Sequence, residues 1–191
     1  METFFNRTNI YDDLQSVLSI SEWLHAIPGE LVVDATVSSL GYQEFFRQLE
    51  KFELSRAGKR TQTINIQAKS LEVLLPASLV DVERCVRILM SELFGAERPL
   101  PYAAWVETRG KGRYLQILVS ERYYSEEPIV YEDFWKSDRF QNKVTGRLCK
   151  ADDPQARRIV KAGDLRKTWT SHFSLKSRLF TADGYARKHS N

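Results

Sequence analysis

Apolar residues recur at helical spacing in three stretches of the chain, which predicts three amphipathic helices. The first stretch, residues 8–27, predicts one helix, either continuous or broken near residues 19–21, and Pro28 ends it. The second, residues 38–57, carries phenylalanine and leucine on one face and charged side chains on the other. The third, residues 77–95, follows a proline and closes at a glycine.

Strand patterns lie between and after these helices. Residues 63–75 are rich in β-branched and apolar side chains and predict one long strand or a pair of strands. Residues 102–108 and 113–124 flank the turn Arg109-Gly110-Lys111-Gly112 and predict a β-hairpin. The order of elements predicts an α+β domain, with an antiparallel sheet and its helices on one face.

The last third of the chain has weaker periodicity. Residues 142–148 predict a turn between short strands, and the remainder to about residue 181 predicts short strands or irregular structure. These patterns divide the chain into an N-terminal helical region at 1–57, an α+β core at 58–127 and a basic, aromatic-rich C-terminal region at 128–191.

The composition is that of a globular protein that folds without metal or disulfide crosslinks. The 191 residues are 42% hydrophobic and 12% aromatic, which supplies enough apolar surface for a core. Cys85 and Cys149 lie far apart without cysteine or histidine neighbours at ligand spacing, so we expect a reducing, cytoplasmic location. The first residues lack a signal-peptide pattern, and no apolar stretch approaches about 18 residues, so we expect no membrane association.

The positive charge is concentrated in the second half of the chain. Residues 1–100 contain 10 basic and 14 acidic residues, a balance of −4, whereas residues 101–191 contain 18 and 11, a balance of +7. Aromatic residues are interleaved with these cations: Trp135, Phe140, Trp169, Phe173, Phe180 and Tyr185. Cations neutralise phosphates and aromatic rings stack on bases, so the mixture suits single-stranded DNA or structured RNA. The alternative is a solvated basic surface whose aromatic residues belong to the core.

Three segments between residues 60 and 125 carry a family resemblance. They are Leu74-Leu75-Pro76-Ala77 with the amphipathic helix after it, Pro101-Tyr102-Ala103-Ala104-Trp105, and residues 113–122, RYLQILVSER. The chain resembles the MobA/MobL-type plasmid relaxases, which belong to the His-hydrophobe-His nucleases of rolling-circle replication and conjugation. The resemblance implies a ferredoxin-like sheet with a metal site on its central strand, and an origin in a plasmid or another mobile genetic element.

The chain departs from this family at the metal site itself. Two histidines of the family share one strand face, and the matching positions here are Tyr114 and Gln116. Neither side chain is a usual ligand for a divalent metal, so metal-assisted nicking does not carry over and we expect no metal or cofactor.

The predicted hairpin still offers groups that suit nucleic acid. Tyr114 can stack on a base or act as a nucleophile, and Gln116 can hydrogen-bond to a base edge. Arg109, Lys111 and Arg113 are positioned to contact phosphates. The alternative is that Tyr114 and Gln116 are ordinary occupants of a half-buried strand, opposite a core face formed by Leu115, Ile117 and Val119.

The C-terminal region adds a candidate base and further cations. His172 lies among hydroxyls and cations, and a metal-independent nuclease needs a general base, a general acid and a cation. The alternative is a surface or hydrogen-bonded histidine. The other candidates for phosphate contact are Lys143, Arg147, Lys150, Lys176 and Arg178.

Two functions follow from these observations. The first is a nucleic-acid-binding protein of a mobile genetic element, either a metal-independent nuclease acting on RNA or single-stranded DNA or an inactive relative. The second is an interaction protein that inhibits a host defence or replication machinery, such as a CRISPR-Cas9 inhibitor, by occupying a nucleic-acid groove or its guide RNA. Acidic residues of the N-terminal half, such as Asp12 and Glu50, would contact a basic protein partner. Phosphate-binding loops and hydrolase triads have no recognisable motif in the chain.

Overall fold

The computed structural model describes residues 14–27, 29–37, 39–56, 66–95 and 100–177. These residues belong to two compact units. The first contains the described residues up to Tyr124 and from Phe173 onward, and is called the sheet unit. The second is Ser125–His172, and is called the insert.

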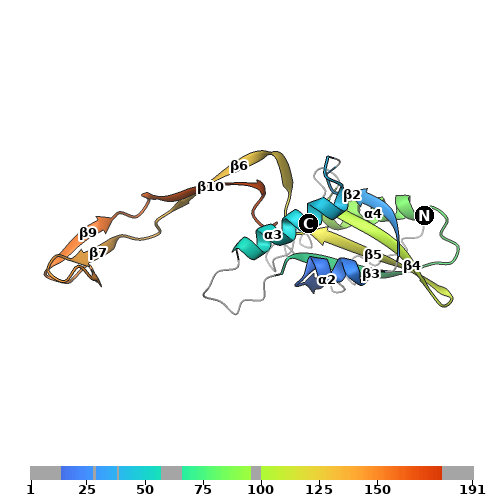
Figure 1. Ribbon diagram of the computed structural model, residues 1–191, viewed down its shortest axis with the longest axis horizontal. Helices are drawn as coiled ribbons and strands as arrows, with labels where there is room; N and C mark the ends of the chain where they lie inside the picture. The colour runs from blue at the N-terminus through green and yellow to red at the C-terminus, as the bar shows by residue number, and fades with distance from the viewer. Residues whose placement is uncertain (1–13, 28, 38, 57–65, 96–99, 178–191) are drawn as a thin grey trace. The chain divides into compact units, whose positions relative to one another are not determined.

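The sheet unit is built on five antiparallel strands in the order β1-β3-β5-β4-β2 (Figure 1). β5 is the central strand and pairs along its whole length with β3 and β4. The strands are β1 (Gln15–Val17), β2 (Glu30–Ala35), β3 (Ala68–Leu75), β4 (Tyr102–Arg109) and β5 (Gly112–Ser120). The mixed α and antiparallel β class predicted from the sequence is confirmed.

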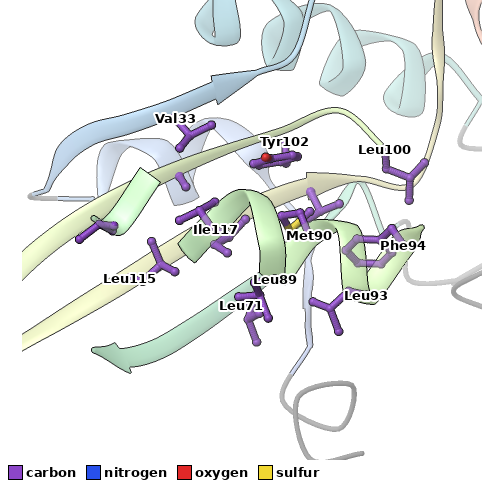
Figure 2. Close-up of a cluster of buried hydrophobic side chains, with 14 of the residues drawn as sticks. Val33, Leu71, Leu89, Met90, Leu93, Phe94, Leu100, Tyr102, Leu115 and Ile117 are labelled. Carbon is purple, nitrogen blue, oxygen red and sulfur yellow. The ribbon is translucent and has the colours of Figure 1, made fainter. Parts of the chain in front are cut away.

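Helices cover both faces of this sheet, and the prediction of a single covered face was wrong. α4 (Val82–Phe94) packs on the face that presents Leu115 and Ile117, as Figure 2 shows. α3 (Gly41–Arg56) packs on the opposite face, in one cluster with Leu118. Successive side chains of a strand point to opposite faces, and β5 is apolar on both near its end, so each face requires its own helix.

The N-terminal segment contains one strand, β1, where a helix was predicted, and a second strand, β2, where no element was predicted. β1 pairs with β3 from Gln15 opposite Ser70, and β2 lies at the other edge of the sheet. Helix α2 (Ile20–His25) begins only after Ser19, whose hydroxyl accepts the Glu22 N–H at 3.3 Å. Sheet pairing and this cap therefore override the helical period of the earlier residues, and residues 8–13 lie outside the described part.

The insert consists of five strands with no buried apolar residue among its described positions. β6 pairs with β10, and β7 lies between β8 and β9. The strands are β6 (Tyr124–Phe134), β7 (Arg139–Asn142), β8 (Leu148–Cys149), β9 (Ala156–Val160) and β10 (Leu165–Phe173). The predicted turn between short strands is confirmed at residues 143–145, between β7 and β8. None of the helices in the described part of the chain is long and apolar enough to cross a bilayer.

Candidate nucleic-acid interface

Tyr114 and Gln116 lie on the central strand and share the sheet face that also presents Leu118. Leu118 is buried in the α3 cluster, whereas Tyr114 and Gln116 are half-buried. The pairing register places Tyr114 opposite Glu107 of β4, and Gln116 opposite Glu72 of β3. The predicted core face of β5, opposite these residues, is confirmed by the burial of Leu115, Ile117 and Val119.

Carboxylates on the neighbouring strands engage the polar groups around Tyr114. The Arg109 guanidinium donates to Glu107 at 2.6 Å and to Glu72 at 2.9 Å, and its central carbon lies 5.0 Å from the centre of the Tyr114 ring. The Gln116 amide also donates to Glu72. The bonds to Glu107 and Glu72 raise the pKa of Arg109, and the same two carboxylates neutralise its charge. Arg109 is therefore a weak phosphate contact.

The two other cations of the hairpin differ in exposure. Arg113 is half-buried and donates from Nη1 to the Leu79 carbonyl at 3.0 Å, which fixes its guanidinium against the start of α4. Lys111 lies exposed in the turn and forms no ion pair with a described residue. The hairpin therefore presents one cation to solvent without a carboxylate beside it.

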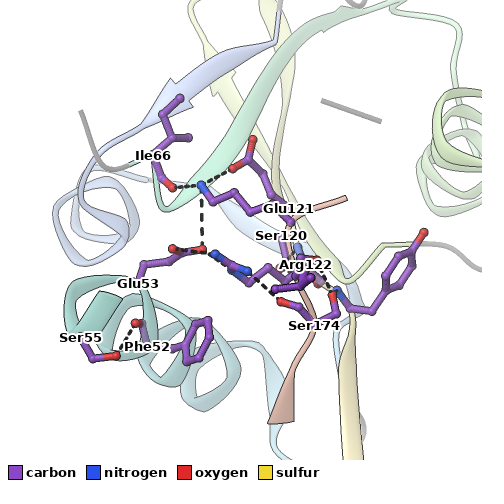
Figure 3. A network of polar contacts seen from close by, with 11 residues as sticks. Phe52, Glu53, Ser55, Ile66, Ser120, Glu121, Arg122 and Ser174 are labelled. Atoms are coloured by element: carbon purple, nitrogen blue, oxygen red, sulfur yellow. Dashed lines mark hydrogen bonds and ion pairs between the residues drawn. The ribbon is translucent and has the colours of Figure 1, made fainter. Parts of the chain in front are cut away.

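Glu53, Glu121 and Arg122 form a buried ion network in the sheet unit (Figure 3), and the exposed Lys176 lies at its edge. Its ammonium donates to Glu121 at 2.6 Å and to the Ile66 carbonyl. Beside it, Arg122 forms a bidentate pair with Glu53, with Nη2 at 3.1 Å from Oε2, and donates to the Ser174 carbonyl at 2.8 Å. Lys176 therefore holds the chain after β10 against the core. The remaining candidate of this segment, Arg178, lies outside the described residues.

In the insert, Lys143 and Arg147 are exposed in the β7–β8 turn, and Lys150 is exposed directly after β8. Asn142 orders that turn: its Oδ1 accepts the N–H groups of Val144 and Thr145, both at 2.9 Å. The backbone of the turn that carries Lys143 and Arg147 is thus ordered by local hydrogen bonds of the Asx type. None of the three cations forms an ion pair with another residue in the described ranges.

The three cations belong to a larger basic region, residues 135–164, which we call the distal segment. It contains eight basic and four acidic residues, a balance of +4. Its one described ion pair joins Arg158 to Asp138 at 3.3 Å. Strand β6 is opposite in character, because it contains four carboxylates and no lysine or arginine. The sequence predicted the basic region but not this separation within the insert.

Three aromatic side chains of the insert, Tyr131, Trp135 and Trp169, contact other side chains of the insert. The guanidinium carbons of Arg139 and Arg166 lie 4.4 Å and 4.9 Å from the centre of the Trp135 ring. Trp169 stacks on Tyr131 with the ring centres 5.5 Å apart. Arg139 was not among the predicted site residues, although its position four residues after a tryptophan was visible in the sequence.

The remaining aromatic residues that the sequence proposed for base stacking are not among these side-chain contacts. Phe173 is buried in the α3 cluster of the sheet unit, as the alternative interpretation of the sequence predicted for such rings. Phe140 is half-buried. Phe180 and Tyr185 lie outside the described residues.

His172 is exposed at the end of the insert and bonds to its own strand pair. Its Nδ1 lies 3.0 Å from the Ser125 carbonyl oxygen. A carbonyl only accepts, so Nδ1 carries the proton, and in neutral His172 the lone pair is on Nε2. This tautomer leaves Nε2 able to accept a proton, as a general base must. The other candidate catalytic residue, Tyr114, belongs to the sheet unit and not to the insert.

The described residues contain no group of three histidine, cysteine, aspartate or glutamate side chains that could hold a metal ion. Comparison with protein-family models, curated proteins and solved structures found no significant match to this chain. The candidate interface therefore rests on the chemistry of its own residues.

Proposed function

We propose that the chain binds nucleic acid through the distal segment of the insert. The observation that carries this proposal is a set of exposed cations without ion pairs to described residues, of which Lys143 and Arg147 lie in one ordered turn and Lys150 follows the strand after it. Each cation that meets a phosphate releases condensed counterions, and this release drives sequence-independent binding. An ordered turn lowers the entropic cost of forming those contacts.

The hairpin supports this role less well than the insert does. Arg109 is held by two carboxylates, and Arg113 is tied to a backbone carbonyl. A phosphate would have to displace these partners before it gained a contact. We therefore assign the main contact to the insert.

The experiment is a salt titration of binding to labelled single-stranded DNA, structured RNA and duplex DNA. The triple variant Lys143→Ala, Arg147→Ala, Lys150→Ala should bind more weakly, and its log–log salt slope should fall by roughly one unit for each phosphate that is no longer neutralised. The matched control removes three exposed cations of the sheet unit through Lys51→Ala, Arg84→Ala and Arg87→Ala. The proposal fails if both triple variants keep the wild-type slope. The same gels, run with EDTA, report whether binding is followed by metal-independent cleavage.

A second candidate function is supported by apolar side chains on the same unit. Val144, Leu148 and Ile159 are 79%, 64% and 45% exposed in the distal segment. Apolar side chains that are exposed in a free protein often become buried when a protein partner binds. These residues therefore favour an interaction protein that blocks a nucleic-acid machinery. A chain that binds none of the three nucleic acids would leave this second function as the better proposal.

A further inference from the structure

We infer that the insert recognises duplex DNA through its phosphate backbones, and that single strands are the poorer ligand. This inference rests on the proposed function and makes its substrate class specific. It differs from the expectation drawn from the sequence, in which aromatic rings would stack on unpaired bases.

The first step concerns the rings. A base stacks on the face of an aromatic side chain that is open to solvent. In the insert, two guanidinium groups lie over Trp135, and Trp169 is stacked on Tyr131. These rings therefore order the insert's own side chains, and a single strand would have to displace those contacts before it could stack.

Phe134 is the exception, because it is 46% exposed. It lies on β6, two residues from Glu132 and next to Asp133, which pairs with Arg166 at 3.2 Å. A phosphate chain that brought a base to this ring would pass the Glu132 carboxylate. The exposed ring is thus placed where a polyanion is repelled.

The second step concerns the cations. Trp135 holds the Arg139 guanidinium on its ring, where it forms no ion pair with a described residue. On the three-stranded sheet, the register sets Arg157 and Leu148 on either side of Gln141, so the three share one face. Arg157 is exposed on that face. The distal segment thus offers cations from several strands and turns, and duplex DNA has one charge per about 1.7 Å of axis, twice the density of a single strand.

The third step concerns shape. A two-stranded β-ribbon is one of the elements that the major groove of B-DNA admits, whereas the major groove of A-form RNA is deep and narrow. The pair β7 with β9 is such a strand pair in the distal segment, with only the two-residue strand β8 on the other side of β7, whereas the pair β6 with β10 contains the acidic strand β6. Backbone bonds close the base of the β7–β9 pair, because the Trp135 N–H donates to the Asp164 carbonyl at 3.0 Å and the Gly163 N–H donates to the Trp135 carbonyl at 2.9 Å. This geometry favours duplex DNA over duplex RNA.

The test uses the full chain with three probes of one sequence, about 30 nucleotides long: duplex DNA, its single strand and duplex RNA. At equal salt, we expect duplex DNA to bind about tenfold more tightly than either other probe, with the steeper salt slope that B-DNA gives. Tryptophan fluorescence should stay unquenched by the single strand. Tighter binding of the single strand with quenched fluorescence, or tighter binding of duplex RNA, would overturn the inference while leaving the proposed function standing. Absence of binding to every probe would overturn both.

Two variants separate phosphate contact from stacking within the insert. Arg157→Ala should weaken duplex binding several-fold, whereas Phe134→Leu should change it less than about twofold, because only the first removes a phosphate contact. Circular dichroism of both variants checks that the strands are retained. A larger loss from Phe134→Leu than from Arg157→Ala would show that stacking dominates and would refute the inference.

Discussion

Arg109 and Arg139 carry the same charge and have different partners. Arg109 is neutralised by Glu72 and Glu107, whereas Arg139 rests on the Trp135 ring and keeps its full positive charge. A ring stabilises a cation without cancelling it, but a carboxylate cancels it. This difference is the reason why the proposed phosphate contacts are assigned to the insert and not to Arg109.

At the residue scale, Asp153 gives a pH-dependent prediction. Its carboxylate accepts the Gln155 N–H at 2.8 Å and the Asn142 amide at 3.1 Å, and these bonds lower the pKa of Asp153. Because its pKa is lowered, the Asp153 carboxylate stabilises the connection between β8 and β9 at a pH above its usual pKa of about 3.9. This stabilisation is lost as the pH falls through the lowered value. NMR titration of the Gln155 amide should give a midpoint below about 3.9. Asn142→Ala should raise that midpoint, and a wild-type midpoint at or above about 3.9 would contradict the assignment.

At the element scale, the success of sequence reasoning depended on burial. The helices at residues 38–57 and 77–95 were predicted because each buries one apolar face. The short strand β1 was missed because its partner, β3, lies more than 50 residues away. The strands of the insert bury no apolar face, so they carry little period-two signal in the sequence.

For the candidate site, too, the sequence could not show which distant strands pair. Alternation along β5 correctly placed Tyr114 and Gln116 on one face, but Glu72 comes from a strand whose register was unknown. The position of Glu107 could have been predicted from the sequence, because the hairpin turn pairs Arg109 with Gly112 and thereby sets Glu107 opposite Tyr114. Local turns fix a register that sequence can show, whereas distant strand pairs do not.

The buried ion pair between Glu53 of α3 and Arg122, which follows β5, gives a prediction for stability. Their side chains are 2% and 5% exposed, so Glu53→Ala leaves an unpaired buried guanidinium and should cost about 3–5 kcal/mol of unfolding free energy. Glu44→Ala on the same helix breaks a more exposed pair with Arg47, which water screens, and should cost much less. Urea unfolding of both variants measures the difference. Equal losses would contradict the importance of the buried pair.

At the scale of the whole molecule, the sheet unit contains every described buried apolar side chain. Tyr124 and Phe173, which bound the insert, lie in that unit with their ring centres 5.3 Å apart. The chain can therefore leave the core at Tyr124 and return at Phe173 over a short distance. The sheet unit does not depend on the insert for its apolar core.

Replacing Ser125–His172 with a short glycine-containing turn tests this independence. We expect the shortened chain to keep a single cooperative thermal transition, because both apolar clusters remain intact. It should also lose salt-dependent nucleic-acid binding, because the distal segment is gone. Calorimetry and the gel assay measure the two outcomes. Loss of cooperative unfolding would show that the insert is part of the core, and retained binding would move the interface to the sheet unit.

If nucleic acid binds to the insert as proposed, the sign of the charge that it meets changes at strand β6. The distal segment has a balance of +4, whereas β6 carries four carboxylates, of which Asp133 is paired with Arg166 of β10. Electrostatic attraction therefore ends at the boundary between the distal segment and β6, and the carboxylates of β6 disfavour binding beyond that boundary. The length of nucleic acid that one chain covers is then set by the distal segment, and lengthening the β6–β10 ribbon would not enlarge that footprint.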